Sequence, residues 1–152
     1  MPGHLILVRP HTSLLDGPVV ARYLQQIGGH YGYLFAVDPD YARHPVYSRL
    51  LRWYGRLTGG HRMTALDQRS SIGVRRILRE LEGHGRVVLF PQGTGIGDAN
   101  RPDLPGADWL VRKSRCAVSE ITLSHDHWFP RVIENRILCS GQAKEPRLRK
   151  SV

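Results

Sequence analysis

The chain has 152 residues, 41% of them hydrophobic, and its 22 Lys and Arg against 13 Asp and Glu give a formal net charge of +9 at pH 7. This length and composition suit one domain with one hydrophobic core, and they exclude a disordered or a collagen-like chain. The positive charge favours anionic partners such as nucleic acid, phospholipid surfaces or phosphorylated metabolites, but charge alone does not choose among them.

The two cysteines, Cys116 and Cys139, are far apart and lack the spacing of metal ligands, which indicates a reducing compartment and no structural zinc. The longest apolar run near the N-terminus, residues 5–8, is too short for a membrane span or a signal-peptide core. Because this first segment already reads as a strand, the sequence leaves open a further segment upstream in a larger natural chain.

Strand-like and helix-like segments alternate along the chain. The continuous apolar run at 5–8, closed by Pro10, predicts a strand buried on both faces. Such alternation predicts a single-domain α/β sandwich whose mostly parallel or mixed sheet is flanked by helices, with the site at the carboxyl ends of the strands. We expect this domain over residues 1–143 and a basic C-terminal tail over 144–152. Apolar spacing and turn residues further predict strands at 31–37, 86–90, 117–123 and 131–138, helices at 44–57 and 107–114, and a loop at 96–107. Two more helices are predicted, one that starts near Asp16 and stops at Gly28-Gly29, and one that Ser70 or Ser71 could cap and Gly83 or Gly85 could stop.

His11 and Asp16 follow the first strand directly. On one regular helix, five residues would turn the two side chains about 140° apart, so His11 must lie in the turn before the helix. Pro18 supports a helix start near Asp16, because proline is tolerated in a first turn. A carboxylate on one ring nitrogen would leave the other free to take a proton from a substrate hydroxyl. The alternative is a helix cap, because Ser13 and Asp16 have the spacing of a capping box.

Two loops together carry a family resemblance. His11-Thr-Ser-Leu-Leu-Asp16, followed later by Phe90-Pro-Gln-Gly-Thr94, resembles the N-H-x-x-x-x-D and F-P-E-G-[TR] blocks of the glycerolipid acyltransferases, which act on lysophospholipids and 1-acylglycerol-3-phosphate. The resemblance runs from about Leu5 to about Leu123 and is strongest to the 2-acylglycerophosphoethanolamine acyltransferase branch. Further segments similar to that branch are Asp16-Gly17, Phe35-Ala-Val37, Tyr47 to Trp53, Leu66-Asp67, Val87 to Gly93, Gly106-Ala107 and Lys113-Ser114.

This resemblance implies an enzyme that moves a fatty acyl group from a thioester, acyl-CoA or acyl carrier protein, to the free hydroxyl of a lysophospholipid or glycerol phosphate. His11 would be the general base and Asp16 would orient it. No cofactor and no metal is required. The resemblance further implies a cytoplasmic protein, peripheral on the inner face of the membrane, whose partners include an anionic membrane surface and not nucleic acid.

By the same resemblance, Gln92, Gly93 and Thr94 would bind the polar head of the acceptor. Gly93 lets the backbone approach closely, and exposed N–H groups with a threonine hydroxyl suit phosphate oxygens. Taken alone, this loop would equally be a turn that ends a strand. Arg62 and Arg69 are candidates for the phosphate charge, with solvated surface arginines as the alternative.

Several residues depart from the family pattern. Pro10 replaces the usual asparagine, Gln92 the usual glutamate and Gly95 a frequent arginine, while Glu120 stands about where a fourth block has proline. A diverged inactive relative is therefore one alternative function. Another is a basic module that binds anionic lipid or RNA without catalysis, through arginines interleaved with aromatic residues at 47–54. His125-Asp126-His127 is interpreted as a mobile polar turn and not as a metal site, because no further ligands have a recognisable spacing.

Overall fold

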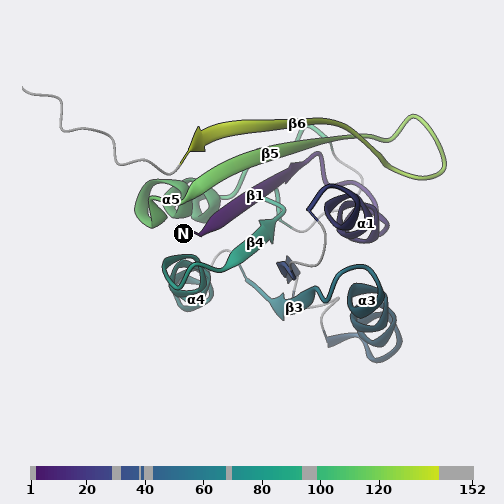
Figure 1. The fold of residues 1–152 in the computed structure, drawn as a ribbon, viewed down its shortest axis with the longest axis horizontal. Coiled ribbons are helices and arrows are strands. Elements are labelled where there is room, and N and C mark those ends of the chain that lie inside the picture. The colour runs from purple at the N-terminus through teal and green to yellow at the C-terminus, as the bar shows by residue number, and fades with distance from the viewer. Residues whose placement is uncertain are drawn as a thin grey trace, which may run out of the picture.

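The computed structural model describes residues 3–28, 32–37, 39, 43–67, 70–93 and 99–140. These residues form one sheet with helices on both of its faces (Figure 1). In chain order the elements are β1 (His4–Arg9), α1 (Asp16–Gly28), β2 (Leu34–Val37), α3 (Pro45–Leu57), β3 (Arg62–Ala65), α4 (Ser71–Glu82), β4 (Arg86–Leu89), α5 (Pro105–Ser114), β5 (Ala117–Ser124) and β6 (Arg131–Ser140).

The sheet has six strands in the order β3-β2-β4-β1-β5-β6. Every neighbouring pair is parallel except β5 and β6, which form an antiparallel hairpin. The predicted α/β class with a mixed sheet between helices is therefore confirmed. The predicted basic tail at 144–152 lies outside the described residues, so the domain boundaries stay a prediction.

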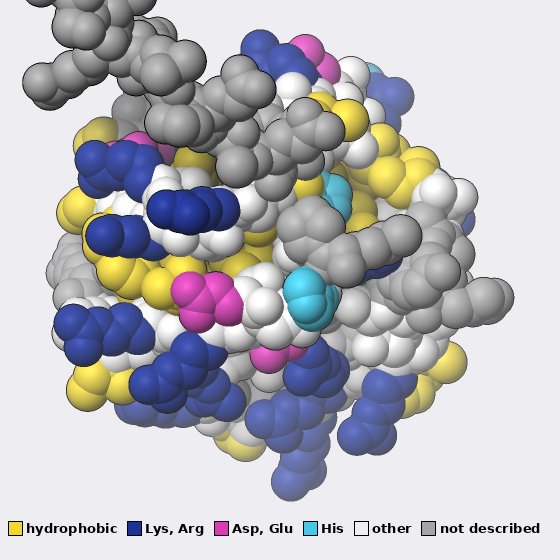
Figure 2. All heavy atoms as spheres, turned by 60° about the vertical axis from the view of Figure 1, so that its left-hand side comes forward, with side chains coloured by type: hydrophobic (Ala, Val, Ile, Leu, Met, Phe, Trp, Pro, Cys, Tyr) yellow, Lys and Arg dark blue, Asp and Glu magenta, His cyan; other side chains and the backbone are white. Residues whose placement is uncertain are grey.

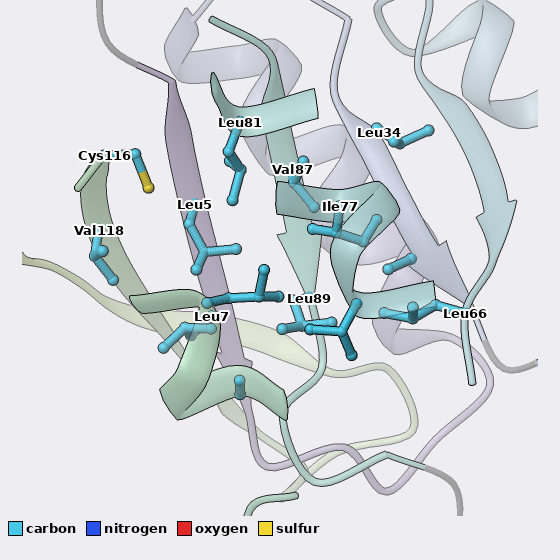
Figure 3. Packing of buried hydrophobic residues seen from close by; sticks show 14 residues of the cluster. Leu5, Leu7, Leu34, Leu66, Ile77, Leu81, Val87, Leu89, Cys116 and Val118 are labelled. Atoms are coloured by element: carbon cyan, nitrogen blue, oxygen red, sulfur yellow. The ribbon is translucent and has the colours of Figure 1, made fainter. Parts of the chain in front are cut away.

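The core consists of two apolar clusters, one on each face of the sheet. Leu5 and Leu7 of β1 belong to the cluster under α4 and α5, whereas Ile6 and Val8 belong to the cluster under α1. Successive side chains of a strand point to opposite faces, so only a continuous apolar run can supply both clusters. Figure 3 shows the first cluster, in which Leu81 of α4 packs with apolar side chains of the sheet.

The helices form where apolar spacing meets suitable end residues. In α4, the buried residues Val74, Ile77 and Leu81 repeat at helical spacing, and Gly83 caps the C-terminus. Helix α3 begins after His44, whose ring nitrogen Nδ1 accepts a hydrogen bond from the Tyr47 N–H at 3.1 Å. Within the described residues, no helix combines the length and the apolar character needed to cross a bilayer.

Sequence patterns missed two boundaries and one strand. Strand β3 has mostly half-exposed or exposed side chains and exists because it pairs with β2, a contact that its own sequence does not encode. Helix α5 begins at Pro105, inside the predicted loop at 96–107, because proline suits a first helical turn. In place of the predicted strand at 31–37, the described strand covers only Leu34–Val37.

Candidate active site

Three neighbouring strands, β4, β1 and β5, bring the candidate residues together. They run parallel, so their carboxyl ends share one edge of the sheet. Gln92 follows β4, His11 follows β1 and His125 follows β5. Hydrogen bonds join these segments although the bonded residues stand 81 and 109 positions apart in the chain. The topology thus builds a site from three loops at the place where ligands bind in open α/β sheets.

The carboxylate of Asp16 is the centre of this site, and its side chain is 0% exposed. Its Oδ2 lies 2.9 Å from His11 Nδ1 and also accepts hydrogen bonds from the backbone N–H groups of Thr12 and Ser13, at 2.9 and 3.0 Å. Its Oδ1 lies 2.7 Å from His125 Nε2. A buried carboxylate is stable only when its oxygens are bonded in this way.

Opposing effects act on the ionisation of Asp16. Burial would raise the pKa of the carboxyl, but hydrogen bonds from His11, from the Ser13 backbone and from His125 outweigh it and hold the pKa below its ordinary value. Asp16 is therefore ionised at neutral pH and can only accept hydrogen bonds. It follows that His11 carries its proton on Nδ1 when the ring is neutral, which leaves a lone pair on Nε2.

The His11 ring borders a cavity. Its centroid lies 4.3 Å from that of the Phe90 ring, with 32° between the ring planes, and this contact restricts the orientation of the imidazole. No hydrogen bond joins Nε2 to another of the described residues. The arrangement can therefore take up a proton from a molecule in the cavity and stabilise the resulting imidazolium.

The structure combines the two interpretations of the histidine loop. Asp16 accepts from the Ser13 N–H, and Ser13 Oγ accepts from the Leu15 N–H at 3.1 Å, which are bonds of the helix-capping kind. The same Asp16 oxygen also contacts the His11 ring. Capping fixes the carboxylate on α1, so it helps to hold the imidazole as well.

Gln92 joins the loop after β4 to the histidine loop. It is buried, and its Oε1 accepts from the His11 backbone N–H at 2.9 Å. Its Nε2 donates to the carbonyl oxygens of Ala99 and Arg101, at 3.0 and 2.7 Å. A glutamate could make the first bond but, when ionised, neither of the others. The residue that departs from the family pattern thus matches its surroundings.

Gly93 follows at the edge of the cavity, with φ at +69°, a backbone conformation that favours glycine. Its carbonyl accepts a hydrogen bond from Arg101 at 3.1 Å. Arg101 Nε is the one buried side-chain nitrogen or oxygen of the described residues that has no hydrogen-bond partner. Thr94 and Gly95 lie outside the described residues.

The predicted arginines have different outcomes. Arg62 borders the cavity, and its Nη2 lies 2.6 Å from Glu80 Oε1 in an exposed ion pair. Part of its charge is therefore balanced within the protein. Arg69 lies outside the described residues. Arg52 of α3 also borders the cavity. Its sequence position does not single it out, because the same helix contains several arginines.

The cavity has a volume of about 370 Å³, and an apolar groove of about 280 Å³ shares part of its lining. Both spaces are bordered by Leu14 of the histidine loop and by Tyr47 and Leu51 of α3. Pro18 and Tyr54 also border both spaces. Further residues around the cavity are Phe35, Val37, Met63, Leu66 and Asp67, and further residues along the groove are Leu15, Leu50 and Trp53. The groove is therefore apolar, whereas polar side chains such as His11 and Arg62 border the cavity together with apolar ones.

A second histidine, His61, borders the same cavity just before β3. Its Nδ1 accepts from the Tyr33 N–H at 3.0 Å, and its Nε2 lies 3.2 Å from the Ala21 carbonyl oxygen. Burial lowers the pKa of this imidazole and keeps the ring neutral. Both of its nitrogens are occupied by backbone groups.

Sequence reasoning missed His125 and Arg101. The sequence pattern indicates a mobile polar turn at His125, whereas the side chain of this residue is hydrogen bonded to Asp16. The available signal was its position directly after a predicted strand, but the sequence could not show that this strand lies beside β1. Among the described residues, no group of three or more His, Cys, Asp or Glu is arranged to hold a metal ion.

The sequence matches no protein-family model and no curated protein. The fold is similar to the crystal structure of the 1-acyl-sn-glycerophosphate (LPA) acyltransferase PlsC from Thermotoga maritima, with a TM-score of 0.51 and 15% sequence identity. The similarity covers 90% of this chain and 56% of that structure, so the chain spans little more than half of its length. The shared feature is the α/β sandwich, and the predicted 2-acylglycerophosphoethanolamine branch stays a prediction.

Proposed function

We propose that the protein is an acyltransferase that moves a fatty acyl group from acyl-CoA or acyl carrier protein to the free hydroxyl of a lysophospholipid or glycerol phosphate. The observation that carries this proposal is the His11 imidazole, which borders the cavity and bonds through Nδ1 to the buried, ionised Asp16. The fold similarity to a lysophosphatidic acid acyltransferase supports the same class of reaction.

In this mechanism His11 Nε2 takes the proton of the acceptor hydroxyl as its oxygen attacks the thioester carbonyl carbon. Asp16 stabilises the imidazolium that forms. The tetrahedral intermediate then collapses, the carbon–sulfur bond breaks, and His11 returns the proton to the leaving thiolate. The products are the acylated acceptor and the free thiol, and histidine and aspartate end in their starting states.

The combined cavity and groove suit a substrate with a polar head and a long apolar chain. We propose that the head lies toward Gly93, Thr94, Arg62 and Arg69, where backbone N–H groups and guanidinium groups can contact phosphate. The acyl chain would lie along the groove beside Leu50 and the other apolar residues of α3. Gln92 would serve the site by joining the two loops, since both ends of its amide contact protein groups.

We further propose that the protein acts in the cytoplasm, with the mouth of this groove on the inner face of an anionic membrane. Leu14, Leu15 and Trp53 are exposed beside the groove although they are apolar, and arginines accompany them on α3. Apolar side chains among cations are typical of helices that lie on anionic bilayers. Replacing Trp53 with serine should lower binding to phosphatidylserine vesicles, measured by sedimentation, and leave the fold intact.

Binding without catalysis remains the competing function. Figure 2 shows Lys and Arg side chains spread over the side of the molecule where α4 and α5 lie, so the positive charge is not confined to α3. A basic module that binds RNA or lipid would need this charge but not the imidazole of His11.

Labelled acyl-CoA or acyl carrier protein, offered with a panel of lysophospholipids and glycerol phosphates, tests the proposal. In His11→Asn the amide can still donate to Asp16, while the nitrogen that would take the proton is absent. Loss of a general base should lower turnover by about 10²–10⁴-fold. His84→Asn is the matched control, because His84 is exposed, has a φ of +66° that asparagine tolerates, and lies between α4 and β4.

Turnover that survives in His11→Asn would contradict the proposed mechanism. A folded wild-type chain that transfers no acyl group from either donor, but binds vesicles or RNA, would favour the binding module. The preferred acceptor, phosphatidylethanolamine-type or glycerol phosphate, would decide the branch.

A further inference from the structure

Strand β6 forms one edge of the sheet. Its ten residues pair with β5 on the inner side (Figure 1), and no strand among the described residues pairs with its outer side. Two apolar side chains of this strand, Ile133 and Ile137, are 63% and 74% exposed. An edge strand presents a row of backbone N–H and C=O groups to which another strand can bind. Strand β6 therefore offers a site for backbone pairing with apolar contacts beside it.

The sequence of β6 is self-complementary about Asn135. Glu134 and Arg136, of opposite charge, flank this residue, and Ile133 and Ile137 follow at the next positions. When two copies of the strand lie antiparallel with Asn135 opposite Asn135, each residue faces the one at the same distance on the other side of Asn135. Glu134 then faces Arg136 of the second copy. Opposite charges at directly opposed positions stabilise antiparallel strands.

We propose that β6 is a dimerisation edge: it pairs antiparallel with β6 of a second copy of this chain, with Asn135 at the two-fold axis. The six strands of each copy then form one continuous sheet across the interface. A two-fold interface requires a self-complementary surface, and the order of residues around Asn135 supplies it. This inference goes beyond the proposed acyltransferase function and does not depend on it.

The charged side chains lie on the same face of β6. Asn135 Nδ2 donates to the Tyr23 hydroxyl of α1 at 3.3 Å, so Asn135 lies on the face covered by α1. Glu134 and Arg136, one position to either side, therefore lie on the opposite face. Directly opposed residues of paired strands share a face, so Glu134 of one copy comes beside Arg136 of the other.

Both charged side chains are available for such a contact. Arg136 is 57% exposed, and its Nη2 lies 3.1 Å from Glu120 Oε1 of the neighbouring β5. A guanidinium group has five N–H donors, so it can bind a second carboxylate as well. Glu134 is exposed and has no ion-pair partner among the described residues. Pairing therefore places each Arg136 between Glu120 of its own chain and Glu134 of the second copy.

Two register shifts limit the length of the contact. Strand β6 is irregular relative to β5 near Ile133 and near Leu138, which leaves residues 134–137 as the regular segment between them. Bulges bend and twist an edge strand and so shorten the pairing that it can make. We therefore expect a weak, reversible dimer with a dissociation constant on the order of 10⁻⁵ M.

The charges of β6 favour a second copy over an anionic partner. Glu134 lies between the exposed Ile133 and Ile137, and its carboxylate would repel phospholipid head groups or nucleic acid. The net charge of +9 opposes self-association in general, so attraction must come from opposite charges at the contact itself. The pair of Glu134 and Arg136 supplies them twice, once on each side of the axis.

Sedimentation analysis of the full chain over a range of concentrations tests the dimer. Glu134→Lys should raise the dissociation constant by about tenfold or more, because it places two positive charges opposite each other on both sides of the axis. Glu82→Lys is the matched control, since it makes the same change of charge at an exposed residue of α4. A wild-type chain that stays monomeric well above the expected dissociation constant would overturn the proposal, as would a dimer equally sensitive to both substitutions.

A charge exchange provides a second test. Arg136→Glu should also weaken the dimer, but in a mixture of Glu134→Lys and Arg136→Glu chains opposite charges face each other again, so mixed dimers should form. Circular dichroism checks that Arg136→Glu is folded, because this variant loses its bond to Glu120. If both chains are folded and the mixture forms no more dimer than either variant alone, the proposed pairing is wrong.

Disulfide cross-linking tests the register. The Cα atoms of directly opposed residues lie about 4.5–5.5 Å apart, within reach of a disulfide. In a chain whose Cys139 is replaced by serine, Asn135→Cys should therefore form a covalent dimer with oxidised glutathione as the oxidant. Glu134→Cys in the same background should form much less, because its own counterpart is two positions out of register. Cross-linking of Glu134→Cys but not of Asn135→Cys would overturn the proposed axis.

Discussion

The loop after β1 and the turn before β3 each place a histidine at the same cavity, yet the two rings have different surroundings. His11 is bonded to a carboxylate through one nitrogen, and its ring borders the cavity. His61 is bonded to backbone groups at both nitrogens, and burial lowers its pKa. Position at the cavity therefore does not distinguish a base from a structural residue. The distinction lies in whether one nitrogen remains available and whether a negative charge stabilises the protonated ring.

Among the substitutions that test the contrast between His11 and His61, Asp16→Asn should have the largest effect on turnover. The amide keeps one acceptor oxygen toward His11 and turns its NH2 group toward His125, but it removes the negative charge that stabilises the His11 imidazolium. We expect turnover to fall by about 10³–10⁴-fold, by analogy with orienting carboxylates in other enzymes. Chemical denaturation should show a loss of about 1–3 kcal/mol in the free energy of unfolding. A variant with near-normal turnover would show that Asp16 is only a helix cap.

The next effect concerns His61→Ala, which should act on stability more than on chemistry. Its loss leaves the buried Tyr33 N–H without its acceptor and opens space beside Phe35. The free energy of unfolding should decrease by about 2–4 kcal/mol in urea titrations. A variant as stable as wild type, with turnover reduced as far as in His11→Asn, would reverse the roles of the two histidines.

Gln92→Glu tests the surroundings of His11 from the loop after β4, whose Gln92 side chain accepts a hydrogen bond from the His11 backbone. At neutral pH the glutamate would face the carbonyl oxygens of Ala99 and Arg101 without a proton to donate. We expect a loss of about 1–3 kcal/mol in stability, and part of it should return as the carboxyl becomes protonated on acidification. Thermal unfolding at several pH values measures this. Higher activity with unchanged stability would instead show that the family glutamate is better suited to this site.

The smallest effect is the pH dependence of stability itself. Burial lowers the pKa of His61, and burial with the nearby Arg86 charge lowers that of His4, relative to the ordinary value of 6.5. These two histidines therefore bind protons at higher pH in the unfolded chain than in the folded one, so their contribution to stability is full above pH 6.5 and declines below it. Asp16, whose pKa lies below its ordinary 3.8, adds a further loss only at more acidic pH.

Urea midpoints measured between pH 8 and pH 5 test this dependence, and the decline should amount to about 1–2 kcal/mol. His4→Asn should reduce it, because His4 would no longer take up a proton on unfolding. Urea midpoints that increase from pH 8 to pH 5 would show that the folded protein stabilises the charged forms of His4 and His61.

Much of the fold could be predicted from sequence because its signals are local. The apolar run of β1 and the spacing of Val74, Ile77 and Leu81 in α4 depend only on the period of a strand or helix. Strand β3 could not be predicted, since its residues lack a buried face and gain their structure from pairing with β2. Within the site, His11 and Asp16 are five positions apart, so turn geometry sufficed to pair them.

The sequence by itself determined the alternation of strands and helices, the histidine loop and the second loop at Gln92, because each depends on neighbours along the chain. Only the tertiary structure decided that His125 joins Asp16 and that the Gln92 amide holds the His11 backbone. The physical reason is strand order: with β1 between β4 and β5, three loops distant in sequence meet at one edge of the sheet. No local pattern encodes that order, which follows from burying both faces of the whole sheet at once.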